Sequence, residues 1–234
     1  MSLLTKPALL RAINEGRIFV RPMDPEQVGN ASIDLRLGDW IWRQSRTATH
    51  LNPYEEQSTA NMWGEVPKRC PSLGALLLES ASLTRKMFAP ARLEDRILLL
   101  HPGECVLAHT LEFVGGVDRK ITTKMQARSS VGRNSISVCV DAGWGDVGYF
   151  NRWTMEIQNR NPHAWTFLIC GTRICQMIFL EGEEIDMSDM YSLVGKYQTD
   201  GQLDNVMSSW KPEHMLPKMW NDREIKERTD DGKN

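Results

Sequence analysis

The chain has 234 residues, of which 41% are hydrophobic and 25% charged, and 28 basic against 30 acidic side chains leave a net charge of −2. No apolar run approaches the roughly 20 residues that a helix needs to cross a bilayer, and the N-terminus lacks the apolar core of a signal peptide. The balanced charge gives no general electrostatic reason to bind nucleic acid. We therefore expect a cytoplasmic globular protein that uses neither a membrane nor a nucleic acid as partner.

The five cysteines and five histidines do not follow the spacing of a zinc site. No two cysteines form a Cys-x-x-Cys pair, and most lie in apolar stretches. We expect reduced cysteines that serve as small hydrophobic side chains in a cytosolic protein, and no bound zinc.

A short helix is predicted near the N-terminus, over residues 5–16, because Thr5 can cap it, Pro7 lies in its first turn and Gly16 stops it. After this helix, apolar residues alternate with polar ones, which is typical of half-buried strands. Many short strands with few helices predict an all-β barrel or sandwich. The strands predicted in chain order span residues 32–37, 97–100, 104–111, 135–140, 153–157, 166–170 and 174–180.

Two regions interrupt this pattern. Residues 44–92 are irregular and contain four prolines, so we expect an insertion with one or two short helices around residues 73–78. The tail, residues 211–234, is charged and ends in RTDDGKN, which predicts a frayed terminus. We find no internal repeat and no low-complexity linker, and we expect one domain over residues 1–234.

The residues most indicative of chemistry lie between Ala127 and Asn159. This segment opens with RSSVGR at residues 128–133, where guanidinium groups, hydroxyls and a glycine can together hold a polyphosphate. A polar surface turn would have the same composition, so both interpretations stay open on this motif alone. The following DAGWGDVGY, residues 141–149, predicts a hairpin that either lines a pocket or merely connects two strands.

Glu156 is the next candidate. It lies on a predicted strand whose core side carries Trp153, Met155 and Ile157, so its carboxylate points to the opposite face. That face is either solvent or a cleft, and the alternation alone does not choose between them.

Taken together, RSSVGR, DAGWGDVGY and TMEIQN resemble the dCTP deaminase branch of the dUTPase-like superfamily. The resemblance covers most of the chain, leaving out residues 44–92 and the tail. It implies a mainly β fold, a distorted β-barrel or jelly roll of the dUTPase-like type with a few short helices, including an N-terminal one. Further matching motifs are NASIDLRLG at residues 30–38, LHPGE at 100–104, GTRICQ at 171–176 and GKYQ at 195–198.

The resemblance also implies roles for individual residues. Glu156 would be the general base, and Asp146 would stand where dUTPases keep the aspartate that positions their hydrolytic water. Arg133 would belong both to this catalytic set and to the phosphate site. The implied substrate-binding residues are Arg128, Ser129, Ser130 and Arg133 for the triphosphate, Lys196 and Tyr197 closing over it, Ala142 for the pyrimidine, and Gln176 on the late strand.

The chemistry of such a site is coherent. Deamination at C4 of cytosine requires a nucleophilic water and proton delivery to the leaving amine, and zinc deaminases carry a His-x-Glu…Pro-Cys-x-x-Cys pattern that is absent here. A zinc-free route needs a carboxylate in a partly dry pocket, the role expected of Glu156. The implied reaction is dCTP + H₂O to dUTP + NH₃, with Mg²⁺ bound through the nucleotide phosphates. The resemblance further implies a homotrimer with active sites shared between subunits.

Two alternatives remain open. The presence of Asp146 allows a dUTP diphosphatase, or a bifunctional enzyme that releases dUMP and diphosphate. Departures from the family pattern at Asp141, Trp144 and Asp200 leave the nucleotide undetermined, and they also allow a catalytically inactive nucleotide-binding regulatory module. Glu156 favours the deaminase over the strict dUTPase, because a dUTPase has no need of a carboxylate at that strand position.

Overall fold

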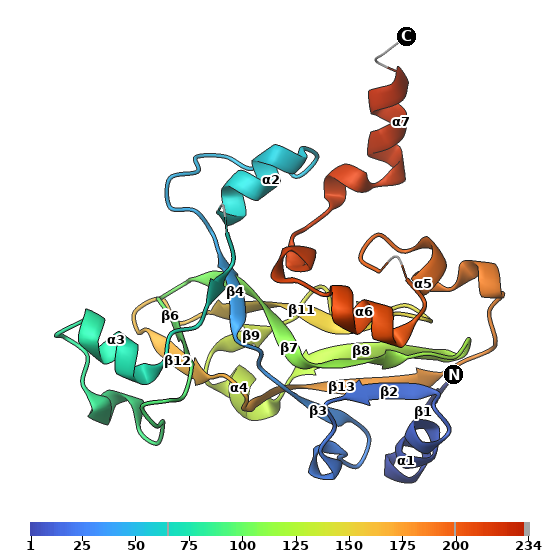
Figure 1. The fold of residues 1–234 in the computed structure, drawn as a ribbon, viewed down its shortest axis with the longest axis horizontal. Helices are drawn as coiled ribbons and strands as arrows, with labels where there is room; N and C mark the ends of the chain where they lie inside the picture. Colours follow the sequence, from blue (N-terminus) through green and yellow to red (C-terminus); the bar gives the residue numbers. More distant parts are fainter. Residues whose placement is uncertain (65, 199, 232–234) are drawn as a thin grey trace.

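The computed structural model describes residues 1–64, 66–198 and 200–231 and consists mainly of antiparallel strands (Figure 1). The mainly β fold agrees with the sequence prediction, although the described strands form separate sheets rather than one closed barrel. The first large sheet contains β1 (Ser2–Leu3), β13 (Arg173–Glu181), β8 (Ile121–Ala127) and β10 (Trp144–Gly145) in that order, with β3 (Ile33–Arg36) also paired to β13.

The second large sheet carries the strand on which Glu156 lies. Its order is β5 (Lys68–Arg69), β4 (Trp40–Arg43), β7 (Cys105–Gly116), β11 (Phe150–Asn159) and β9 (Ile136–Val138), and β2 (Ile18–Arg21) also pairs with β7. A small third sheet joins β6 (Ile97–Leu100) to β12 (Thr166–Ile169).

The main core lies between the two large sheets and explains the alternation seen in the sequence. On β11, Trp153, Met155 and Ile157 belong to this core and are at most 3% exposed, whereas Thr154 and Glu156 between them are only partly buried. From the other large sheet, the core-facing side of β13 contributes Met177 and Phe179 to the same cluster. All seven predicted strands are present; β6 has the predicted bounds, the ends of the others differ by a few residues, and β11 is extended most.

Helices are short and lie around the sheets. Helix α1 follows Thr5, whose side chain makes no capping hydrogen bond, and ends before Gly16, which adopts a φ of +73°. The helices are α1 (Lys6–Asn14), α2 (Glu56–Trp63), α3 (Leu73–Glu79), α4 (Ser129–Arg133), α5 (Tyr191–Val194), α6 (Leu203–Ser209) and α7 (Arg223–Asp231), with single 3-10 turns at Pro25–Gln27, Arg85–Phe88, Met187–Asp189, Pro212–Met215 and Met219–Asn221.

Residues 44–92 contain the expected helix α3, and also α2 and β5. The prediction of a frayed tail was wrong for most of its length. Residues 212–221 form two 3-10 turns, and 223–231 form α7, which extends away from the body (Figure 1). The final residues 232–234 lie outside the described part of the chain. In the described ranges, no helix combines the length and apolar character needed to span a membrane.

Candidate active site

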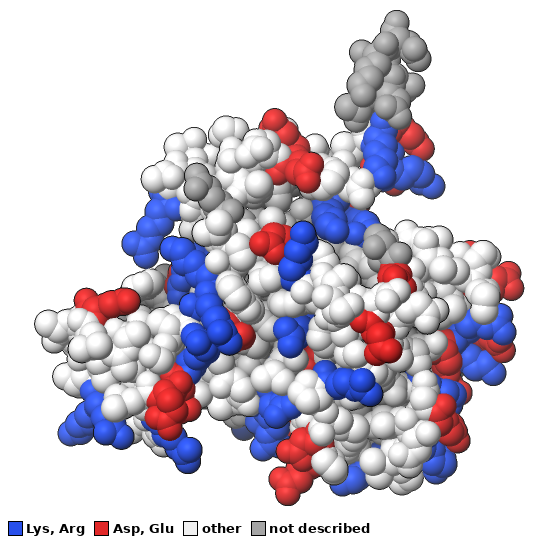
Figure 2. Space-filling model, in the orientation of Figure 1, with Lys and Arg blue, Asp and Glu red and all other residues white. Residues whose placement is uncertain are grey.

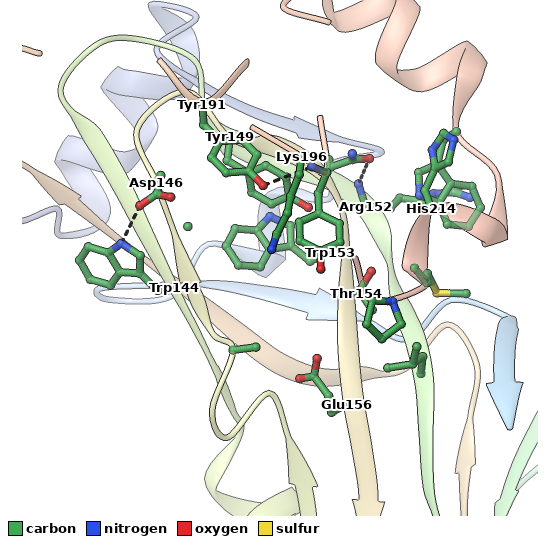
Figure 3. A pocket seen from close by; sticks show the side chains of 18 residues that line it. Trp144, Asp146, Tyr149, Arg152, Trp153, Thr154, Glu156, Tyr191, Lys196 and His214 are labelled. Carbon is green, nitrogen blue, oxygen red and sulfur yellow. Dashed lines mark hydrogen bonds between the residues drawn. The ribbon is translucent and has the colours of Figure 1, made fainter. Parts of the chain in front are cut away.

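A cavity of about 420 Å³ opens between strand β11, the hairpin around residues 142–146 and the C-terminal residues 191–217 (Figure 3). Side chains from these three parts of the chain converge on it. Thr154 and Glu156 enter it from β11 because their neighbours Trp153, Met155 and Ile157 turn into the core or its edge. The cleft therefore decides the question that alternation left open for Glu156.

Glu156 lies at one end of the cavity. Burial raises the pKa of its carboxyl, while its own backbone N–H and the thiol of Cys139 hydrogen-bond to the carboxylate and partly offset this effect. The nearby carboxylate of Asp141 raises the pKa further. A carboxylate with a raised pKa in a half-dry pocket is a stronger proton acceptor than a free one, as a general base requires.

Asp146 lines the same cavity from the hairpin. The indole Nε1 of Trp144 donates a hydrogen bond to Asp146 Oδ1 at 3.1 Å. The hairpin can pack this closely because position 145 is glycine: a Cβ there would lie 2.3 Å from the Trp153 ring and 2.4 Å from Thr123 Oγ1. Ala142, expected near the pyrimidine, is also part of the cavity wall.

Aromatic rings form the wall between the hairpin and the C-terminal residues. Tyr149 packs edge-on against Trp153 at 5.0 Å and against Tyr191 at 5.1 Å. Burial raises the pKa of the Tyr149 phenol, so its hydroxyl stays protonated at neutral pH.

Lys196 and Tyr197 line the cavity, as the resemblance implies. Lys196 forms an ion pair with Asp222, and the Tyr197 hydroxyl accepts a hydrogen bond from the backbone N–H of Lys218 at 3.0 Å. Of the residues that follow Tyr197 in this segment, Thr199 lies outside the described part of the chain. Asp200 is partly buried, accepts hydrogen bonds from the Gln202 backbone and the Asn205 side chain, and is not among the described residues that line the cavity.

The RSSVGR motif lies elsewhere in the same chain. It forms α4, and none of Arg128, Ser129, Ser130 and Arg133 lines the cavity that contains Glu156. Arg128 Nε instead lies 3.7 Å from Asp34 Oδ1, in a separate cavity near Arg173. Gln176, on β13, lies outside the cavity as well, with its Nε2 3.5 Å from Ser32 Oγ.

Several cavity residues were missed by the sequence analysis. The guanidinium of Arg152 lies 4.8 Å from the ring centroid of Phe113 and 4.7 Å from that of Trp210. These two contacts connect the C-terminal segment to the second sheet. His214 also lines the cavity, and burial followed by the charges of two lysines lowers its pKa. No period or motif marked these residues. The missed lining residues include Arg152, Tyr191, Trp210, His214, Met215 and Pro217.

Residues 3–182 match the family model described as dCTP deaminase-like. The chain belongs to this family. Within it, a protein of Methanosphaera stadtmanae named "dCTP deaminase, dUMP-forming" is 32% identical over 185 residues, covering 76% of this chain and 79% of the relative. A protein of Methanobrevibacter smithii with the same name is 28% identical over 182 residues, covering 76% of this chain and 80% of the relative.

Among solved structures, 2′-deoxycytidine 5′-triphosphate deaminase from Agrobacterium tumefaciens resembles this family member with a TM-score of 0.50 at 18% identity. The alignment covers 84% of this chain but only 53% of that chain, so this chain spans about half the length of that structure. At this identity the likeness supports the fold alone. The family match ends at residue 182, and the C-terminal wall of the cavity therefore lies beyond it.

Proposed function

We propose that this member of the dCTP deaminase-like family removes the 4-amino group of dCTP by zinc-independent hydrolysis, with Glu156 as general base. The observation that carries the proposal is the half-buried Glu156 carboxylate, which burial gives a raised pKa, in a cavity of nucleoside size. The names of the two archaeal relatives support the same reaction class.

In the proposed step, Glu156 accepts a proton from water while the water oxygen adds to C4 of the cytosine. The proton passes to N3, and the tetrahedral carbon then expels the amine. The departing nitrogen leaves as ammonia once a proton from the added hydroxyl has been transferred to it through Glu156, and C4 becomes the carbonyl of uracil. The overall balance is dCTP + H₂O to dUTP + NH₃, and Glu156 returns to its carboxylate form.

A second hydrolysis is favoured by the position of Asp146. Its carboxylate lines the same cavity as Glu156, and the hydrogen bond from Trp144 orients it. We propose that Asp146 positions a water molecule for hydrolysis of dUTP to dUMP and diphosphate, in line with the "dUMP-forming" names of the relatives. The alternative is that the reaction stops at dUTP.

The nucleotide is proposed to enter as its magnesium complex. Only two carboxylates, Asp146 and Glu156, belong to the described cavity lining, and the described residues contain no group of three His, Cys, Asp or Glu that converges as a metal site. This donor set fits an ion held mainly by phosphate oxygens, as Mg²⁺ usually is on nucleotides.

We further propose a homotrimer in which RSSVGR of one subunit completes the cavity of its neighbour. The support is geometric: the motif best suited to a triphosphate lies outside the cavity of its own chain. Arg128, Ser129, Ser130, Arg133 and Gln176 keep their proposed roles in substrate binding under this arrangement.

The decisive experiment measures ammonia and diphosphate separately after incubation of the protein with Mg²⁺ and dCTP or dUTP. Ammonia from dCTP is the expected result, and dUMP with diphosphate is expected to accompany it. Accumulation of dUTP without diphosphate would limit the activity to deamination. Nucleotide binding without either product would instead support an inactive regulatory module.

A further inference from the structure

The C-terminal wall of the cavity contains two lysines on one aromatic ring. The ammonium groups of Lys196 and Lys218 each lie 5.5 Å from the centroid of the Tyr197 ring. Lys218 also donates from its backbone N–H to the Tyr197 hydroxyl at 3.0 Å and from its Nζ to the carbonyl oxygen of Lys196 at 3.1 Å. These contacts hold both cations at the edge of the cavity, which Tyr197 and Pro217 line.

One carboxylate, that of Asp222, lies beside the two lysines. Asp222 forms an ion pair with Lys196, and the two side chains are 32% and 33% exposed. Lys218 has no ion pair with a described residue, and Glu56 affects it only at longer range. The group therefore carries two positive charges and one negative charge, and Figure 2 shows basic side chains gathered at the foot of α7.

The rest of the described cavity lining offers an anion less positive charge. Asp146 and Glu156 are acidic, and the guanidinium of Arg152 is held between two rings. Of the Lys and Arg side chains that line the described cavity, Lys196 is the one not held between two aromatic rings, and Lys218 lies beside it.

Lys196 already has a proposed role at the triphosphate; we propose that Lys218 extends this anion subsite within the same chain, and that the Asp222 carboxylate occupies the subsite as an internal competitor. This inference rests on the proposed function only for the identity of the nucleotide. A phosphate that enters must displace Asp222 from Lys196. Because a triphosphate carries more negative charge than one carboxylate, it wins this exchange, but with reduced apparent affinity.

The test compares binding by three variants in calorimetric titrations with inorganic tripolyphosphate, dCTP and uncharged deoxycytidine. Asp222→Asn keeps the shape of the side chain and removes the competing charge. We expect it to bind tripolyphosphate and dCTP about three- to tenfold more tightly than the wild type, with unchanged affinity for deoxycytidine. Lys218→Gln should change the same two affinities in the opposite direction.

Glu224→Gln is the matched control, since it removes one negative charge from the same segment without touching the cavity; its described partner is the exposed Arg223. It should bind all three ligands like the wild type. If Asp222→Asn and Glu224→Gln increased the affinity for tripolyphosphate equally, the change in net charge would explain the effect and the proposal would be overturned. Weaker phosphate binding by Asp222→Asn, or an equal change for deoxycytidine, would also overturn it.

This outcome is independent of catalysis. If the wild type releases no ammonia from dCTP but Asp222→Asn tightens tripolyphosphate binding, the proposed function fails and the subsite stands. If ammonia is released but Asp222→Asn and Lys218→Gln leave phosphate binding unchanged, the subsite fails and the proposed function stands.

Discussion

Cys139 and Glu156 are joined through both backbone and side chain. The backbone N–H of Cys139 donates to the carbonyl oxygen of Glu156 at 3.2 Å, and the Cys139 thiol lowers the pKa of the Glu156 carboxyl. The thiol donates a hydrogen bond to the carbonyl oxygen of Thr154 at 3.5 Å. Burial raises the pKa of the thiol, so it stays protonated and able to donate. The residue that directly follows β9 therefore influences both the position and the basicity of the proposed catalytic carboxylate.

Replacement of Glu156 by Gln tests the general base directly. The amide is nearly isosteric but cannot accept the proton of the attacking water, so we expect the rate of ammonia release from dCTP to fall at least about 100-fold. The affinity for dCTP should change little. Glu183→Gln, at an exposed site outside the cavity, is the control and should retain full activity. Ammonia release that persists in Glu156→Gln would remove Glu156 from the mechanism.

The Cys139–Glu156 contact predicts a shift in pH dependence. Glu156 must be ionised to act as a base, so activity should fall as the pH decreases through its raised pKa. The nearby thiol stabilises the carboxylate and lowers that pKa. In Cys139→Ala the pKa should therefore rise further, and the acidic limb of the rate profile should move to higher pH. Cys139→Ser retains a donor and should shift less. An acidic limb that stays in place or moves to lower pH would show that the thiol does not tune Glu156.

The sequence could predict those parts of the fold whose residues alternate strongly. On β11 the alternation of Trp153, Met155 and Ile157 with Glu156 follows directly from burial on one face only. Strand β8 (ITTKMQA) was missed because its apolar residues are few. It is stabilised as a strand by its antiparallel pairing with β13, which local sequence does not reveal. Strands β2 and β4 were also missed, although β3, β6 and β12, which are equally short, were predicted.

The C-terminal wall of the site could not be predicted for a different reason. The tail is charged, and its apolar residues follow no period. Trp210 is held by tertiary contacts that include Arg152 and His109, and the carbonyl oxygen of Pro212 accepts a hydrogen bond from the indole N–H of Trp42. Such contacts join residues far apart in the chain, so local composition gives no sign of them.

The stack of Arg152 between Phe113 and Trp210 predicts a stability effect. Arg152→Met keeps apolar bulk but removes two cation–π contacts, each worth about 0.5–1 kcal/mol. We expect the free energy of unfolding in urea to fall by about 1–2 kcal/mol and the KM for dCTP to rise as Trp210 loosens. Arg21→Met is the control, since Arg21 contacts a single ring, Phe19, at 5.5 Å and lies outside the cavity. An equal decrease in the free energy of unfolding in both variants would show that the stack of Arg152 between two rings adds no particular stability.

Asp146 should separate the two proposed hydrolyses. Asp146→Asn keeps the acceptor for the Trp144 indole but weakens the orientation of a water molecule near the phosphates. We expect diphosphate release from dUTP to fall about 100-fold or more, while ammonia release from dCTP stays within a few-fold of the wild type. dUTP should then accumulate from dCTP, which chromatography of the nucleotides would detect. Parallel loss of both products would show that Asp146 serves the whole site rather than one reaction.

The separation of Arg133 from the cavity leads to a test of shared sites. Arg133→Gln and Glu156→Gln should each be inactive alone. If Arg133 of one subunit serves the Glu156 cavity of its neighbour, co-expression of the two variants creates some sites with both residues intact. In a randomly mixed symmetric trimer each site draws the two residues from different subunits, so about one quarter of the sites should be functional. If both residues act within one chain, no mixture of these variants can restore activity. The double variant mixed equally with wild type provides the calibration, since shared sites predict about one quarter of full activity and unshared sites about one half. Sedimentation of the active protein as a 26.7 kDa monomer would also contradict the shared arrangement.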